Sequence, residues 1–195
     1  LSGQTSPRAD KLAQLLSTID GARATTNLWG ERWAKLSTNC MGNPVNAMSG
    51  LGSHAQADMV EARLLKVLIA AEAVQVGLAL NYHLESVGGI EAATWLHAND
   101  ASCFEELDRR LAAKGQADWH SSMGQDVLKG RRTEIDHLNG LISRKGREVG
   151  VPTPVNDATV AVVRQIDAGL ITPSPRNVVQ VLRQSEAEIA KPPPH

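Results

Sequence analysis

The sequence predicts an all-α fold, and three observations lead to that prediction. From Asn27 onward, apolar residues recur at helical spacing almost without interruption. Aromatic residues make up only 3% of the chain, so the core must be built mostly from Leu, Val, Ile and Ala, which favours closely packed helices. The segments between the periodic stretches are short and are marked by glycine and proline.

The N-terminal segment differs from the rest. Residues 7–19 carry apolar positions at helical spacing, with Ser6 as the predicted N-cap and Pro7 at the first helical position. Residues 22–26 are short and Thr-rich and predict a single edge strand. Because a lone strand leaves its backbone groups unpaired, residues 1–26 are interpreted as the last α–β unit of a domain whose earlier strands lie upstream.

The helical region is expected to extend from residue 27 to residue 190. A first helix begins at Asn27 and ends at a break around Gly50–Ser53. Residues 56–80 predict a long apolar helix. Its most apolar run, from Val67 to Leu80, contains Glu72 and Gln75, so it is interpreted as a buried helix and not as a membrane span. The remaining helices are predicted at residues 90–99, 102–113, 157–168 and 174–190, and residues 191–195 are expected to be a frayed tail.

The stretch from residue 121 to residue 150 is predicted to be two helices. Gly130 is typical of the residue just past a helix C-terminus. Thr133, with Asp136 three residues later, resembles a capping box and predicts that the second helix begins there and runs to about Glu148.

Composition excludes several function classes. Twenty basic residues against 21 acidic ones give a net charge of -1, so no basic excess is available for nucleic-acid binding. No apolar run reaches the ~20 residues of a membrane span, and no membrane association is expected. Cys40 and Cys103 are expected to be reduced core thiols of a cytoplasmic protein. His120 and His137 have no second ligand at a familiar spacing, so no metal site is predicted.

One polar stripe is a candidate binding surface. Lys35, Asn39 and Asn43 are four residues apart, so on a helix they share one face within roughly 80°. The stripe is either a solvated helix face or the polar wall of a substrate cleft. In the second case Lys35 is a candidate proton donor, and the two carboxamides are candidate hydrogen-bonding groups.

A second polar cluster contains Ser122 and Glu134. In an unbroken helix these residues would be separated by ~18 Å and would not reach the same small molecule. A break at Gly130 allows both to face one cleft, each at the start of a helix, where free N–H groups favour a substrate carboxylate. The alternative for Glu134 is a purely structural role, in which its carboxylate complements the positive end of a helix dipole and binds no substrate.

Together these segments resemble the ketopantoate reductase (2-dehydropantoate 2-reductase) family. The matching motifs, in chain order across about residues 5–165, are Lys35-Leu36-x-x-Asn39-x-x-x-Asn43-Pro44, Ser121-Ser122-Met123-x-Gln125-Asp126, Gly130-Arg131-x-Thr133-Glu134-Ile135-Asp136-x-x-Asn139-Gly140 and Gly150-Val151-Pro152-Thr153-Pro154-x-Asn156.

The resemblance implies a fold, a cofactor and residue roles. Residues 27–190 would be the helical C-terminal substrate domain, of the 6-phosphogluconate-dehydrogenase-like type, preceded in residues 1–26 by the end of a Rossmann domain that holds NADPH. Lys35 would be the general acid that protonates the carbonyl of a 2-oxo acid. Asn39 and Asn43 would hydrogen-bond the substrate, Ser122 would bind its carboxylate, and Glu134 would accept a hydrogen bond from its distal hydroxyl. The implied activity is reduction of ketopantoate to pantoate, in pantothenate biosynthesis.

Two departures leave the substrate open. The family pattern often has another substrate-binding asparagine where this chain has Ser53, and the region from Leu84 to Lys114, with an added Gly88-Gly89 turn, is longer than in short members. No G-x-G-x-x-G phosphate loop occurs in the 195 residues, so the chain alone is expected to be inactive. The alternatives are a reductase of another 2-oxo acid, a member that binds a metabolite without reducing it, and a non-catalytic helical module that forms a homodimer through the helix at 59–80.

Overall fold

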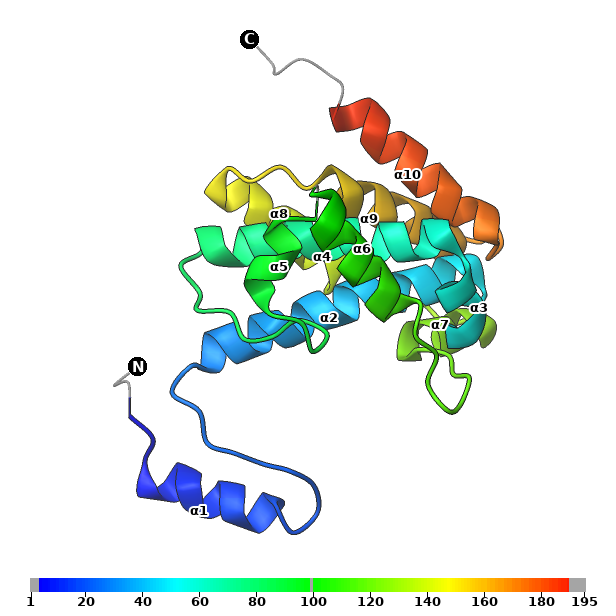
Figure 1. The fold of residues 1–195 in the computed structure, drawn as a ribbon. Helices are drawn as coiled ribbons and strands as arrows, with labels where there is room; N and C mark the ends of the chain where they lie inside the picture. Colours follow the sequence, from blue (N-terminus) through cyan, green and yellow to red (C-terminus); the bar gives the residue numbers. More distant parts are fainter. Residues whose placement is uncertain (1–3, 99, 190–195) are drawn as a thin grey trace.

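The computed structural model describes residues 4–98 and 100–189, and the expected tail at 191–195 lies outside them. Helices account for nearly all regular structure in this part of the chain, which confirms the all-α prediction (Figure 1). The helices are α1 (Pro7–Leu16), α2 (Leu28–Ser49), α3 (Ser53–Asp58), α4 (Val60–Ala79), α5 (Ala92–Leu96), α6 (Ala101–Leu111), α7 (Ser122–Leu128), α8 (Asn139–Val149), α9 (Pro154–Asp167) and α10 (Pro175–Ile189).

The N-terminal helix lies apart from the rest of the fold (Figure 1). α1 begins as predicted, with the Ser6 hydroxyl accepting a hydrogen bond from the Ala9 N–H at 3.2 Å. None of its residues is buried. Residues 22–26 form part of the loop to α2, and the strand predicted there is absent because no described segment pairs with them.

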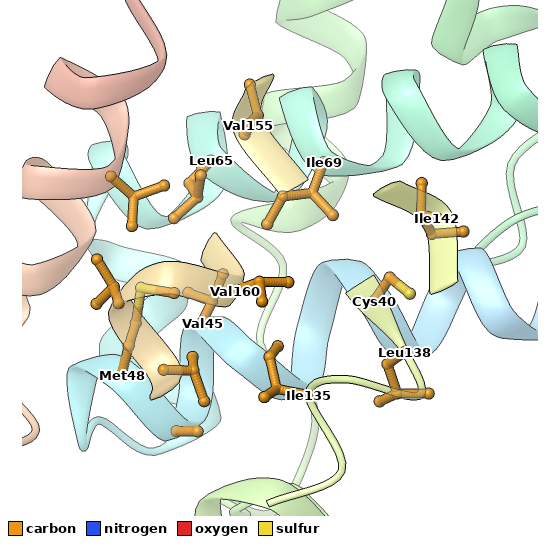
Figure 2. Packing of buried hydrophobic residues seen from close by; sticks show 14 of the residues in the cluster. Cys40, Val45, Met48, Leu65, Ile69, Ile135, Leu138, Ile142, Val155 and Val160 are labelled. Atoms are coloured by element: carbon orange, nitrogen blue, oxygen red, sulfur yellow. The ribbon is translucent and has the colours of Figure 1, made fainter. Parts of the chain in front are cut away.

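The long helices α2 and α4 lie side by side at the centre of the fold (Figure 1). α4 is apolar on most of its circumference because both of its sides are covered. One side packs with α2, α8, α9 and α10 in the larger core cluster, which includes Leu65 and Ile69 (Figure 2). The other side packs against α5 and α6 around Trp95 and Leu107. The suggestion that the helix at 59–80 is a dimer interface is therefore wrong, since this helix forms the core of its own chain.

Glycines end two of the helices as their positions predict. Gly50 follows α2 with a φ of 70°, and Gly150 follows α8 with a φ of 71°, both in the left-handed region that glycine adopts without steric cost. The predicted helix at 56–80 is instead two helices, α3 and α4. Met59 separates them with an extended backbone (φ -87°, ψ 110°).

The Gly130 break is confirmed, but the start of the next helix is different from the prediction. Gly130 has a φ of 65°, and α8 begins only at Asn139. The capping box assigned to Thr133 and Asp136 is wrong because both side chains bind α9 instead. Thr133 Oγ1 donates to Asp167 Oδ2 at 2.8 Å, and Arg164 Nε donates to Asp136 Oδ1 at 2.8 Å. Residues 131–138 are thus a turn-rich segment held against α9.

A buried hydrogen-bond network joins four helices behind the polar stripe of α2. Pro44 has no N–H, so the Cys40 carbonyl one turn earlier lacks its helical donor, and Asn139 Nδ2 donates to it at 3.1 Å. Asn139 Nδ2 also donates to Asn156 Oδ1 at 3.0 Å, and Asn156 Nδ2 donates to Glu72 Oε2 at 2.7 Å. The network fixes α2, α8, α9 and α4 relative to one another.

Candidate functional site

A cleft of about 670 Å³ lies beside α2. It is bordered by α2, by α3 and α4, by the end of α6 with the loop that follows it, and by α7 with the turn after it. All five residues predicted as site residues line this cleft: Lys35, Asn39, Asn43, Ser122 and Glu134.

Helix α2 provides the first wall. Lys35, Asn39 and Asn43 lie on one face of α2 as their spacing predicts, and Thr38 and Gly42 complete that face. The Lys35 side chain is exposed, whereas the two asparagines are half-buried. The buried face of α2 includes Trp33, whose indole N–H donates to the Ala73 carbonyl of α4 at 2.8 Å. The packing of α2 on α4 therefore orients the polar stripe toward the cleft.

Helix α7 is held against α2 by Asn46, a buried residue of α2. Asn46 Oδ1 accepts a hydrogen bond from the Ser121 N–H at 3.1 Å. Ser121 is also the N-cap of α7, its hydroxyl accepting from the Gly124 N–H at 3.1 Å. A β-carbon on Gly124 would lie 1.8 Å from Asn46 Oδ1, so only glycine permits this approach. Ser122, at the first position of α7, is placed in this way at the cleft.

Glu134 reaches the same cleft from the turn after Gly130. Its neighbours fix the backbone on both sides, because Thr133 is bound to Asp167 and the Ile135 side chain is buried in the core. Glu134 itself is exposed and lines the cleft. Contrary to the prediction, it does not begin a helix, so its position is set by tertiary contacts with α9 and not by a helix dipole.

The third wall contains Ser53, the residue that departs from the family pattern, together with residues that the sequence did not single out. Ser53 Oγ donates to Asp118 Oδ1 at 2.9 Å and accepts from the Trp119 N–H at 3.1 Å. His54 Nε2 lies 3.0 Å from the Gly115 carbonyl oxygen. These contacts tie the start of α3 to the loop after α6, whose residues close one side of the cleft. Ser53 therefore has a structural role here, and its hydroxyl is engaged within the protein.

The charges around the cleft are mostly positive. Lys35, Lys66, Arg110 and Lys114 line it, against one carboxylate, Glu134. Arg110 Nε donates to Glu106 at 2.6 Å, and Lys114 Nζ donates to Asp58 at 2.7 Å, whereas Lys35 and Lys66 have no hydrogen bond or ion pair with any described residue. The arrangement favours an anionic small molecule.

Lys66 is the residue whose environment is most unusual. It lies in the middle of the apolar helix α4, one turn after Arg63. Burial and, to a smaller extent, the neighbouring Arg63 guanidinium lower the pKa of Lys66 to about 8. A lysine within the buried stretch of an apolar helix was the available sequence signal, since long basic side chains are rarely placed there without a partner.

A second hollow of about 430 Å³ adjoins the cleft and shares Lys35 and Asn39 with it. Its other lining is largely apolar and aromatic, including Trp29, Trp33 and Tyr82, and the rings of Trp29 and Tyr82 are stacked with centroids 6.3 Å apart. Lys35 thus lies on the ridge between a charged cleft and an aromatic hollow.

The described part of the chain has neither a cluster of metal-type ligands nor a membrane-spanning helix. No group of three or more His, Cys, Asp or Glu side chains is placed to hold a metal ion. None of the helices is both long and apolar enough to cross a membrane. Cys40 is completely buried, as expected, and burial raises the pKa of its thiol well above the usual range, whereas Cys103 is half-buried.

Comparison with known proteins assigns a family to most of the helical region. Residues 27–167 match the family model described as the ketopantoate reductase PanE/ApbA C-terminal domain. A curated 2-dehydropantoate 2-reductase from Archaeoglobus fulgidus is 26% identical over 171 residues, which are 87% of this chain and 52% of the relative. A second, from Mesorhizobium japonicum, is 28% identical over 85% of this chain and 45% of the relative.

Solved structures agree with this fold. A PanE/ApbA family ketopantoate reductase from Ralstonia eutropha JMP134 matches with a TM-score of 0.63 and 27% identity, over 84% of this chain and 50% of that one. A D-mandelate dehydrogenase, solved in complex with NADH, matches with a TM-score of 0.64 and 26% identity, over 85% and 51% of the two chains. The chain spans about half the length of the relatives that it matches.

Proposed function

Because this chain belongs to the ketopantoate reductase family through its C-terminal domain, we propose that it is the substrate-binding part of an NADPH-dependent 2-oxo acid reductase. The observation that carries the proposal is the convergence of Lys35, Asn39, Asn43, Ser122 and Glu134 on one cleft. These residues come from α2, α7 and the turn after Gly130, so neither a solvated helix face nor a simple helix-start acid accounts for their meeting.

In the proposed reaction Lys35 is the general acid. The reduced nicotinamide, when bound, supplies a hydride to the carbonyl carbon of the substrate. Lys35 Nζ donates a proton to the carbonyl oxygen, where negative charge develops in the transition state. Lys35 has no carboxylate partner among the described residues, so its ammonium group is available for this contact.

The other cleft residues bind and orient the substrate. The amide groups of Asn39 and Asn43 would hydrogen-bond the 2-oxo acid along the face of α2. Ser122, at the first turn of α7, would donate to the substrate carboxylate, with Glu134 accepting from a hydroxyl at the distal end. Asn46 acts through Ser121 and Gly124 as a positioning residue, because it holds α7 against α2.

The nucleotide phosphates are expected to bind elsewhere in the whole protein. The sequence contains no G-x-G-x-x-G loop, so we assign the binding of NADPH phosphates to none of these residues. We further propose that residues 1–26 pack on a nucleotide-binding domain. This is supported by the exposed apolar side chains of α1 and the residues after it: Leu12 (51% exposed), Leu15 (59%), Leu16 (55%) and Ile19 (86%).

The proposed substrate is ketopantoate, which would make the protein a cytoplasmic enzyme of pantothenate synthesis. A second candidate is a different 2-oxo acid, and one observation favours it. Ser53 occupies the position of a substrate-binding asparagine in the family pattern, but its hydroxyl is bound to Asp118 and to the Trp119 N–H. The likeness to a D-mandelate dehydrogenase also indicates that relatives of this fold act on other acids.

The test is NADPH oxidation by a protein that joins this chain to a nucleotide-binding domain. Ketopantoate and a panel of 2-oxo acids are compared as substrates. Lys35→Ala should lower kcat by about 10²–10⁴-fold, the range for loss of a general acid. Lys129→Ala, an exposed lysine outside the cleft, is the control and should leave kcat unchanged. Reduction of none of the acids, or full activity of Lys35→Ala, would overturn the proposal. We also propose that the protein forms a homodimer through its helical domain, although not through the buried helix α4, and sedimentation of the same protein tests this.

A further inference from the structure

Lys66 enters the cleft from a different wall than the predicted substrate contacts. Lys35, Asn39 and Asn43 belong to α2, whereas Lys66 belongs to α4 and lines the cleft together with Arg110 and other residues from the end of α6 and the loop after it. A small 2-oxo acid held by the α2 stripe and Ser122 uses only part of a cleft of about 670 Å³. The α4 wall therefore has its own polar group and room for an additional part of a ligand.

The ammonium group of Lys66 is partly buried and forms no ion pair with a described carboxylate, unlike the other cations around it. Arg63, one turn earlier on α4, is paired with Asp108 of α6, with Nε to Oδ1 at 2.6 Å and Nη2 to Oδ2 at 3.1 Å. Arg110 and Lys114, the other cations lining this part of the cleft, are paired with Glu106 and Asp58.

These three cations each have a carboxylate partner, whereas Lys66 has none in the described part of the chain. No described residue forms a hydrogen bond or ion pair with its side chain. A partly buried ammonium without a counter-ion is unfavourable, and an anion arriving from solvent would relieve that cost. The low pKa of Lys66, caused by burial and by Arg63, agrees with an ammonium that has no compensating anion in the free protein.

A second polar atom in the same cleft also lacks a partner. His120 Nδ1 is buried and makes no hydrogen bond, and His120 lines the cleft from the loop that follows α6. Buried polar atoms in native structures are normally satisfied, so an unpartnered atom at a cleft is consistent with a bound ligand completing its contacts.

We propose that Lys66 binds a second anionic group of the substrate, so that the site prefers a 2-oxo acid with a further negative charge, such as a 2-oxo dicarboxylate. This inference rests on the proposed function, since it assumes that the 2-oxo acid unit lies along α2 near Lys35. It selects the second candidate given there, a 2-oxo acid other than ketopantoate, because ketopantoate has no second anionic group. Lys66 is then a specificity-determining residue and takes no part in proton transfer.

The experiment compares two acids of equal length by calorimetric titration of the chain at pH 7. 2-Oxoglutarate carries a second carboxylate, and 2-oxopentanoate carries a methyl group in its place. The chain should bind 2-oxoglutarate about tenfold or more tightly, as expected for one charge-assisted hydrogen bond. Lys66→Met should abolish this preference without weakening 2-oxopentanoate binding. Lys129→Met, which removes an exposed positive charge outside the cleft, should retain the preference.

Thermal unfolding separates a binding defect from a folding defect. Lys66→Met should raise Tm or leave it unchanged, because it removes an unpaired ammonium from a partly buried position. Equal affinity of the unmodified chain for the two acids overturns the inference, as does a preference that survives in Lys66→Met. Failure of the proposed function gives a different result: Lys35→Met would leave the affinity for both acids unchanged. Absence of binding by either acid would overturn both.

Discussion

Glu72 is the residue on which the placement of the cleft walls most depends. Its carboxylate accepts hydrogen bonds from the Val155 N–H at 2.8 Å, the Asn156 N–H at 2.9 Å and Asn156 Nδ2 at 2.7 Å. Asn156 in turn accepts from Asn139, which also donates to the Cys40 carbonyl of α2, the carbonyl that lacks a helical donor because of Pro44. Glu72→Ala would therefore remove the acceptor of a network that reaches the helix carrying Lys35 from behind.

The size of the effect follows from the donors that lose their acceptor. Glu72 is only 9% exposed, and its removal takes the acceptor from three hydrogen bonds at the start of α9, although Asn156 Nδ2 keeps a longer bond to the Ile69 carbonyl at 3.3 Å. Each buried unsatisfied donor costs about 1–3 kcal/mol. The lower end applies here because the substitution also relieves the unfavourable burial of the carboxylate. We expect Glu72→Ala to lower the free energy of unfolding by about 3 kcal/mol at neutral pH.

Urea denaturation followed by circular dichroism measures this change. Glu186→Ala, which removes an exposed carboxylate from α10, is the matched control and should change stability by less than about 0.5 kcal/mol. If Glu72→Ala costs less than about 1 kcal/mol, the hydrogen bonds are not holding α4 to α9, and the explanation given for the position of α2 fails.

Two further predictions concern titration and thiol reactivity. Burial raises the pKa of Glu72 from 4.5 to about 7, so the folded chain keeps this proton where the unfolded chain loses it. The contribution of this proton to stability is present below about pH 4.5 and is lost as the pH rises to about 7. Relative to Glu72→Gln, the unmodified chain should therefore lose up to about 3 kcal/mol of unfolding free energy across that window, as measured by urea titrations. A difference between the two proteins that does not change with pH would contradict this. A thiol reagent should label Cys103 in the native chain but Cys40 only after unfolding, because Cys40 is fully buried and burial raises the pKa of its thiol; rapid native labelling of both would contradict the packing around Cys40.

Local sequence patterns were sufficient for much of the fold. The apolar spacing identified most of the helices, and Gly50, Gly130 and Gly150 marked real chain breaks because each adopts a positive φ. Pro7 and Pro175 likewise stand at the first positions of α1 and α10. These features depend on the conformational preferences of single residues, which a sequence states directly.

The same local geometry explains why part of the site could be predicted. Lys35, Asn39 and Asn43 share a face because the helical repeat is a property of the backbone alone. The break at Gly130 was also the condition that allows Ser122 and Glu134 to face one cleft. The sequence by itself thus determined an all-α domain with a polar stripe on its first long helix.

Tertiary contacts decided the remainder, and each of them joins residues far apart in the chain. Thr133 and Asp136 bind α9 across 34 and 28 positions, which delays the start of α8 to Asn139 and sets the position of Glu134. Lys66 lines the cleft without a partner among the described residues, whereas Arg63, one turn earlier, is paired with Asp108 of α6. Such pairings depend on how the helices pack, and the period of an apolar pattern contains no information about which distant side chain will be the partner.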